Sequence, residues 1–438
     1  MGGAPVHEEP GPTGAQEPDV ALHSRGYLLL LVVSGLVGIP ISAIAFGFLA
    51  AVHELEHVVW DSFPQSMGYD VPPAWWPIPA LGLAGLLCAI AVTRLPGSGG
   101  HVPAMGLTAG ATPPSFLPGV VAAAGASLVL GAVVGPEAPL IALGSGLALV
   151  AVRRGKADDQ VAAVIASAGS AAAISAIFGN PLVAAVILLE AVGLARRQAL
   201  LVVLPCLVSS GVGALVFTGL GDWTGLGIGA LAIPHLEPPG LVTADLVSAI
   251  PLAALVAGAM FVVFVVGKKT ASLAGSRPIM ITVAVGLVAG SSAAVYAVVT
   301  DHSPAEVAMS GQATLPTLAT NPGHWSAFAL VMLLLCKGLA YALCIGVFRG
   351  GSVFPAVFLG AASGVLAGMV FPGIGSVDGL AIGMAAGAAV IGLPITSVLL
   401  TTLLLGDAAT HLMPAIILAA VTAIVVEEML TDRRPAPA

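Results

Sequence analysis

The sequence predicts an all-α polytopic membrane protein with two internal repeats and discontinuous helices. Hydrophobic residues make up 58% of the 438 residues and charged residues only 8%, whereas a soluble domain carries about a quarter charged residues. Long apolar stretches without charge recur along the whole chain. Two of these stretches, one in each half, contain the same glycine and proline pattern.

The apolar stretches are long enough to cross a bilayer, since a spanning helix needs about 20 residues. They are continuous in Ala, Leu, Val, Ile and Gly and lack the alternation of a membrane β-barrel. We therefore expect a multi-pass protein of the plasma membrane whose surroundings are the lipid bilayer. The stretches are residues 27–52, 74–93, 116–136, 161–189, 198–221, 246–267, 278–300, 325–336, 350–377, 379–406 and 412–426.

The polar ends of the chain bound the membrane part. Residues 1–25 are rich in Pro, Gly and Glu and lack an apolar core, so we expect a disordered N-terminal tail and no cleaved signal peptide. We expect a first membrane repeat over 26–222, a second over 243–430 and a short C-terminal tail over 431–438. We expect no cofactor, no bound metal and no nucleic-acid partner.

The shared pattern indicates an internal duplication. Both 135–144 and 351–360 read Gly, three residues, Pro, three residues, Leu-Gly. A further proline, Pro181 or Pro394, follows the motif proline by 42 residues in the first half and by 39 in the second. Because proline loses nothing in the first turn of a helix, each motif predicts a loop that leads into a helix N-terminus inside apolar sequence. The alternative is that Gly and Pro only kink ordinary membrane helices, and the matched spacing disfavours it.

Helix N-termini at membrane depth attract anions, because each carries about half a positive charge and unpaired N–H donors. Glu137 stands in the first of these loops and is the only charged residue between Arg94 and Arg153. A carboxylate there could occupy an anion site and leave it when protonated, which would make a pH-sensitive gate. The alternative role for Glu137 is an interfacial glutamate that caps its own helix.

A third glycine-rich element spans residues 96–103. Ser98 offers a hydroxyl donor, and the glycines allow backbone N–H groups to approach a ligand. A plain loop between helices is the alternative, with His101 as a solvated loop residue. Lys337 and Arg349 flank the helix that leads into the second motif, and we expect both to be solvated or to snorkel.

Together the three elements resemble the CLC family of chloride channels and transporters. Gly97–Pro103 resembles the family's Gly-Ser-Gly-Ile-Pro element, Gly135–Pro139 its Gly-(Lys/Arg)-Glu-Gly-Pro element, and Gly351–Pro355 its Gly-x-Phe-x-Pro element, in the family's order. The similarity covers roughly residues 27–428. It implies a CLC-type inverted two-repeat fold of about eighteen helices, and a homodimer with one anion pathway per subunit. The chain resembles short bacterial members without cytoplasmic CBS domains.

The resemblance also implies residue roles, with Glu137 as the gating glutamate. The implied anion-binding residues are Ser98, Gly99, Gly135, Pro136, Ala138, Gly351, Val353 and Phe354. Several depart from the family pattern. Pro136 replaces a basic residue and Ala138 a glycine, while Val353 stands where the family has Phe, with Phe354 one place late.

Other departures concern proton coupling. Family exchangers typically carry a proton-relay glutamate at the position of Ala191, and this chain has Glu190 beside it. The coordinating tyrosine of the family's last helix is also missing, since the final tyrosine is Tyr341. We therefore expect transport of chloride or a similar small anion that is channel-like or weakly proton-coupled. The alternative is a proton-coupled chloride antiporter with a different proton relay.

One motif indicates another class of protein. His53-Glu54-Leu55-Glu56-His57 matches His-Glu-x-x-His, which places two histidines on one helix face suited to zinc. With Asp378 as a third ligand, it would suit an intramembrane zinc metalloprotease. The motif closes an apolar helix and runs into 60–64, a composition typical of a membrane interface, so we expect no enzyme. A proton-coupled carrier of another small solute would require more buried ionisable residues than the sequence offers.

Overall fold

The computed structural model describes residues 24–107, 110–153, 158–192, 196–226, 233, 236, 240, 242–371 and 373–432. Within these residues the chain consists of helices and the loops that join them, and the only extended pair is an isolated bridge between Gly135 and Gly351. The predicted all-α class is confirmed. Most of the predicted N-terminal tail, 1–23, and of the C-terminal tail, 433–438, lies outside the described residues.

The helices follow the predicted apolar stretches. Nine helical segments of the described residues are long and apolar enough to cross a membrane. The helices of the first half are α1 (Arg25–His57), α2 (Phe63–Ser66), α3 (Pro77–Arg94), α4 (Leu117–Val129), α5 (Glu137–Arg153), α6 (Asp159–Phe178), α7 (Pro181–Val192) and α8 (Arg196–Thr224). Those of the second half are α9 (Thr243–Ala274), α10 (Pro278–Thr300), α11 (Leu315–Thr320), α12 (Ala327–Val347), α13 (Val353–Val370), α14 (Ser376–Ala389), α15 (Pro394–Leu405) and α16 (Asp407–Asp432).

Helices α5 to α8 and α13 to α16 follow the same order in the two halves. Helices α5 and α13 have 17 and 18 residues, and α7 and α15 have 12 each. The apolar stretches 161–189 and 379–406 are each broken into two helices, and Pro181 and Pro394 begin the second helix of each pair. The helix starts predicted at the two Gly-x-x-x-Pro motifs are confirmed, since α5 begins at Glu137 and α13 at Val353.

The paired helices of each repeat pack through glycine at close range. A Cβ atom on Gly144 of α5 would lie 2.3 Å from the carbonyl oxygen of Gly169 on α6. A Cβ on Gly364 of α13 would lie 1.8 Å from the carbonyl oxygen of Gly379 on α14. Such contacts let helix backbones approach without a hydrophobic driving force between them, as is usual in membranes. This close packing holds α5 against α6 and α13 against α14.

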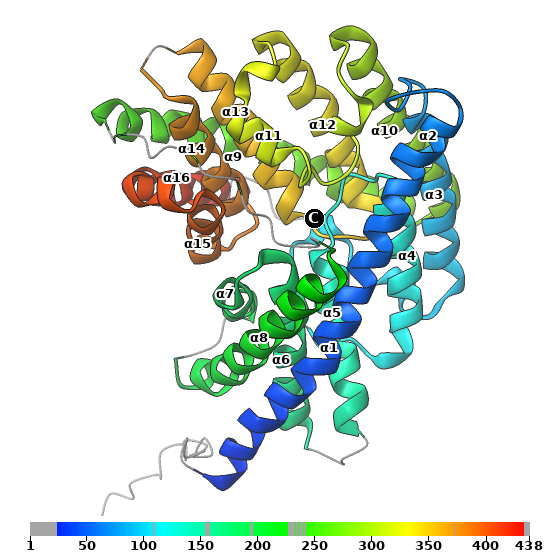
Figure 1. Cartoon of the computed structure of the whole chain (residues 1–438), viewed down its shortest axis with the longest axis vertical. Coiled ribbons are helices and arrows are strands. Elements are labelled where there is room, and N and C mark those ends of the chain that lie inside the picture. Colours follow the sequence, from blue (N-terminus) through cyan, green and yellow to red (C-terminus); the bar gives the residue numbers. More distant parts are fainter. Residues whose placement is uncertain are drawn as a thin grey trace, which may run out of the picture.

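Figure 1 shows how the two halves meet. Helices α1, α5, α6 and α8 lie together on one side, and α13, α14 and α16 lie on the other. Helices α7 and α15 face each other between these groups and are in contact. The loops that lead into α5 and α13 meet inside the molecule, where Gly135 and Gly351 form the bridge and are both buried.

Candidate functional site

The two Gly-x-x-x-Pro loops pair with each other. The Gly135 N–H donates to the Gly351 carbonyl oxygen at 2.8 Å, and the Gly351 N–H donates back to the Gly135 carbonyl oxygen. Helices α5 and α13 begin two residues after these glycines. The bridge thus brings two helix N-termini together, with their unpaired N–H donors and partial positive charges.

The Glu137 side chain lies between these two helix starts and is only 1% exposed. Its Oε1 atom accepts a hydrogen bond from the Phe354 N–H at 2.9 Å, so Glu137 caps α13 from across the repeat boundary. Its Oε2 atom has no hydrogen-bond partner among the described residues. A Cβ atom on Gly351 would lie 1.5 Å from Oε2, so the carboxylate fits only because residue 351 is glycine.

Aromatic side chains surround the start of α13. The Phe354 ring stacks on the Phe178 ring at the end of α6, with centroids 5.4 Å apart and planes at 23°. The Tyr341 hydroxyl of α12 donates to the Ser352 carbonyl oxygen at 2.7 Å and so holds the loop that leads into α13. No sequence pattern singled out Phe178, because an aromatic residue at a helix end is common in apolar sequence.

Arg349 joins the Ser98 loop to the loop before α13. Its Nε atom donates to the Ser98 carbonyl oxygen at 3.2 Å, and its Nη1 atom donates to the carbonyl oxygens of Val347 at 3.0 Å and Phe348 at 3.3 Å. Arg349 is only 8% exposed, so the prediction of a solvated or snorkelling side chain is wrong. The reason is that inward-facing carbonyl groups replace water around the guanidinium.

Lys337 is also buried, and its predicted snorkelling is wrong in the same way. Its exposure is 0%, and its Nζ atom donates to four consecutive carbonyl oxygens, those of residues 306–309, at 3.0–3.2 Å. The ammonium also lies 4.9 Å from the centroid of the Phe358 ring. These acceptors come from a distant loop, so no local sequence signal could reveal them.

The predicted anion-binding residues fall into two groups. Gly135, Pro136, Ala138, Gly351, Val353 and Phe354 lie in the two paired loops and the first turns of α5 and α13. Ser98 and Gly99 belong to a separate short 3-10 turn (Pro96–Gly99), and among the described residues no hydrogen bond joins them directly to Glu137. Ser98 has a left-handed φ of 49°, a conformation that costs a non-glycine residue about 1–3 kcal/mol. Arg349 helps to hold this strained turn.

His101 is partly buried and not a fully solvated loop residue, because its Nε2 atom contacts the Gly106 carbonyl oxygen. Burial lowers the pKa of His101, the Arg349 guanidinium acts in the same direction, and the contact with Gly106 opposes them. The neutral form of His101 therefore dominates at neutral pH. This leaves Glu137 as the stronger candidate for a proton-sensitive group at the site.

Glu190 caps the N-terminus of α15, as Glu137 caps the N-terminus of α13. Its two carboxylate oxygens accept hydrogen bonds from the N–H groups of Ile395 and Thr396, both at 2.7 Å. Both oxygens are thus engaged in capping a helix N-terminus. Ala191, at the family's relay position, is partly buried and carries no titratable group.

A cavity of about 260 Å³ reaches the Gly135–Glu137 loop at Pro136. Helix α1 contributes Leu49, Val52, His53 and Glu56 to its wall, and the loop segment 308–314 lines the opposite part. Sequence reasoning missed this loop segment, because it carries no recognisable motif. The cavity therefore lies next to the paired helix starts.

The His-Glu-x-x-His motif lies at the end of α1. His53, Glu54 and His57 are exposed, and His57 Nδ1 lies 3.3 Å from the Ser62 hydroxyl. Among the described residues, a third metal ligand does not join His53 and His57. The motif therefore lacks the ligand set of a zinc protease.

These features define a class of membrane protein. Interrupted helices whose N-termini converge inside an apolar bundle are typical of proteins that carry ions across membranes. Residues 84–428 match the family model for the voltage-gated chloride channel, and the chain belongs to this CLC family. Members of the family are transporters or channels, and the predicted class of anion transport is confirmed.

Known proteins similar to this chain agree with the family assignment. The chain is 26% identical over 348 residues to the "Putative ion-transport protein YfeO" of Escherichia coli O1:K1 / APEC, covering 78% of this chain and 80% of that protein. A Shigella boydii serotype 4 protein of the same name is 26% identical over 347 residues, with 78% and 80% covered.

Solved structures show that the fold is of the CLC type. A slow cyanobacterial Cl-/H+ antiporter matches with a TM-score of 0.75 and 18% identity, over 94% of this chain and 96% of the other. A CLC-type fluoride/proton antiporter matches with a TM-score of 0.66 and 15% identity, over 92% and 96%. A eukaryotic CLC transporter matches with a TM-score of 0.63 and 17% identity, over 93% and 73%. The predicted discontinuous two-repeat fold is confirmed.

Proposed function

We propose that this protein conducts chloride or a similar small anion through a pathway gated by Glu137. The supporting observation is the position of the Glu137 carboxylate, which accepts the Phe354 N–H at 2.9 Å where the N-termini of α5 and α13 meet. A small anion can accept the same N–H donors. Protonation removes the charge that favours the carboxylate at this place, so the side chain leaves and an anion enters.

The proposed pathway runs from the cavity at Pro136 to the loops that Gly135 and Gly351 hold together. There Ala138, Val353 and Phe354, in the first turns of α5 and α13, provide backbone N–H donors and an apolar wall. It continues toward Ser98 and Gly99, which Arg349 connects to the second loop. The buried guanidinium adds a positive charge near this route. We also propose that 26–222 and 243–430 are the two repeats, and that two copies form a homodimer.

We further propose that transport is channel-like or only weakly coupled to protons. Ala191 offers no proton acceptor, and both oxygens of Glu190 are occupied by the N-terminus of α15. The alternative is proton-coupled antiport with another relay, and two of the structurally similar proteins are named as proton antiporters. That alternative requires a second titratable group with access to the Glu137 region.

An anion efflux assay tests the proposal. Protein reconstituted in liposomes loaded with KCl is expected to release chloride when valinomycin balances the charge. Bromide and nitrate loads measure selectivity, and protein-free liposomes are the control. Chloride release no faster than from the protein-free liposomes would overturn the proposal.

A further inference from the structure

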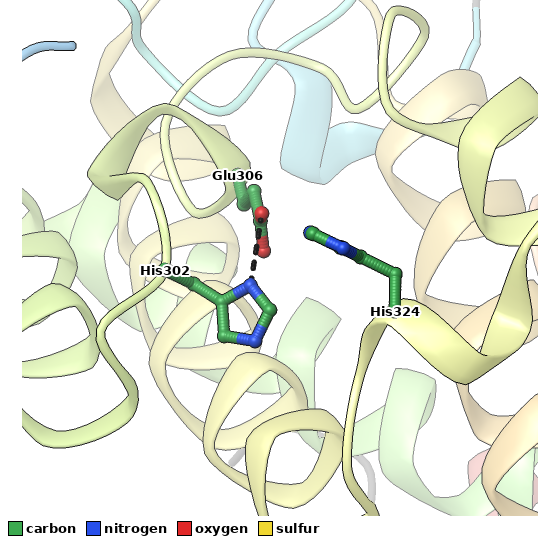
Figure 2. A group of neighbouring side chains, drawn as sticks. All are labelled: His302, Glu306 and His324. Carbon is green, nitrogen blue, oxygen red and sulfur yellow. Dashed lines mark ion pairs between the residues drawn. The ribbon is translucent and has the colours of Figure 1, made fainter. Parts of the chain in front are cut away.

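A His-Glu-His cluster lies in the loop between α10 and α12, away from the paired helix starts. His302 follows the end of α10, Glu306 ends one 3-10 turn (Pro304–Glu306), and His324 ends another (Pro322–His324). One ligand atom from each residue lies within 4.8 Å of the other two. Figure 2 shows the three side chains directed toward a common point, with His302 Nδ1 3.4 Å from Glu306 Oε1.

Neighbouring aromatic residues hold the cluster in place. Glu306 Oε2 accepts hydrogen bonds from Trp325 Nε1 at 2.7 Å and from the Tyr296 hydroxyl. The His302 ring lies near the Tyr296 and Trp325 rings, with both centroids 6.0 Å away and planes at 28° and 9°. Glu306 therefore has one oxygen fixed and the other directed at the two histidines. Hydrogen-bonded carboxylates of this kind are typical of metal sites, where outer partners orient the ligands.

The backbone of the cluster is fixed as well. Lys337 Nζ donates to the Glu306 carbonyl oxygen at 3.0 Å and to the next three carbonyl oxygens along the chain. Because this ammonium binds main-chain carbonyl groups, the Glu306 carboxylate does not form an ion pair with Lys337 and remains available as a ligand. The side chains of His302 and Glu306 are 14% and 12% exposed, whereas His324 is exposed. His324 can thus adjust while the other two stay in place.

We propose that His302, Glu306 and His324 form a binding site for one divalent transition-metal ion, of which zinc is the best fit. Imidazole nitrogens and a carboxylate oxygen suit zinc, and three protein ligands leave a fourth position for water. Zinc holds such ligands at about 2.0–2.2 Å. The three ligand atoms, which lie within 4.8 Å of one another, must move closer to reach these distances, and the exposed His324 has the most room to do so.

Metal binding at this site would tie together two parts of the loop that lines the cavity. Residues 308–314, which follow Glu306, line the cavity that reaches Pro136, and the Met309 N–H donates to the Gly131 carbonyl oxygen at 2.9 Å. The ion would link this segment, which precedes α11 in the chain, to His324, which follows α11. The site itself does not depend on the proposed transport activity, because binding is measured without an anion gradient.

Zinc binding by the full-length protein, purified without a histidine tag, tests this proposal. Isothermal titration with ZnCl₂ is expected to give one site per chain, and Co²⁺ is expected to produce visible absorption bands of a bound ion. The His324→Ala variant removes an exposed ligand and is expected to bind zinc at least about 10–100-fold more weakly. Trp325→Phe removes one donor to Glu306 and is expected to weaken zinc binding by a smaller factor.

His53→Ala is the matched control, because His53 is also an exposed histidine and belongs to the other zinc-like motif. It is expected to bind zinc as the wild type does. Zinc is also expected to raise the unfolding temperature of the wild type and of His53→Ala but not of His324→Ala. Absence of zinc binding, equal binding in His324→Ala, or loss of binding in His53→Ala would each overturn the proposal.

Discussion

Replacing Glu137 by glutamine tests the gate most directly. The variant keeps the size of the side chain and removes its charge, so it mimics the protonated glutamate. In the structure the carboxylate accepts the Phe354 N–H at 2.9 Å, between two helix N-termini. A neutral amide is held less firmly there, because neither the charge-assisted hydrogen bond nor the helix dipoles favour it as strongly. We expect Glu137→Gln to raise chloride efflux at neutral pH and to abolish its dependence on pH.

The magnitude follows from the contacts of the carboxylate. A hydrogen bond to a charged group contributes about 1.5–3 kcal/mol, against about 0.5–1.5 kcal/mol for a neutral pair. The central values of the two ranges differ by about 1.2 kcal/mol, which corresponds to a change of about eightfold in occupancy of the site by the side chain. Efflux is expected to rise by a similar factor where release of Glu137 limits transport.

Chloride efflux from proteoliposomes, followed with a chloride electrode from acidic to neutral pH, measures this effect. Glu190→Gln is the matched control, since Glu190 also caps a helix of the other repeat but at α15. That variant is expected to retain the pH dependence of the wild type. If Glu137→Gln shows unchanged efflux that still varies with pH, Glu137 does not gate the pathway.

Three further predictions concern the surroundings of the gate. In Gly351→Ala the new Cβ would lie 1.5 Å from Glu137 Oε2, so we expect the same fast, pH-independent efflux as in Glu137→Gln. The control is Gly338→Ala, which has no atom within 4 Å of its new Cβ and should behave as the wild type. Slower efflux in Gly351→Ala than in the wild type would contradict this prediction. Lys337→Met leaves four carbonyl groups without their donor and is expected to destabilise the protein by about 3 kcal/mol or more. The measurement is the unfolding temperature in detergent, which should fall in Lys337→Met and stay nearly unchanged in Lys268→Met, where the replaced lysine is exposed. Finally, an imposed chloride gradient is not expected to drive protons uphill into wild-type proteoliposomes, and sustained uphill proton movement would favour antiport.

The sequence was sufficient to predict where the membrane helices are interrupted, because the signals are local. A proline at the first turn restricts the backbone of that turn alone, and the two Gly-x-x-x-Pro motifs lead into helices that begin at Glu137 and Val353, as predicted. The lone charge of Glu137 inside apolar sequence was likewise a local signal, since few reasons exist to place a carboxylate there. The repetition of the glycine and proline pattern in the two halves made the two-repeat fold predictable.

The contacts within the site could not be predicted in the same way. Lys337 and Arg349 read as ordinary basic residues at the ends of apolar sequence, where the usual expectation is solvation. Their burial depends on carbonyl groups that come from other loops, at residues 306–309 and at Ser98. Every residue has a carbonyl group, so the sequence carries no mark of which ones face inward. The clustering of His302 with His324 is hidden for a similar reason, because it depends on how the loop folds.

A comparison of the two capping glutamates explains why only one is a candidate gate. A helix that begins inside the bilayer exposes N–H donors that water cannot satisfy, so each such start needs a side chain or a ligand as its cap. Glu190 accepts hydrogen bonds from the N–H groups of Ile395 and Thr396 with both oxygens, at 2.7 Å each, so that two bonds hold this cap. Glu137 uses only one oxygen in its bond to α13, its other oxygen has no partner among the described residues, and a cavity reaches the neighbouring Pro136. A cap that is held by one bond and is reachable from a cavity is the one that an incoming anion can replace.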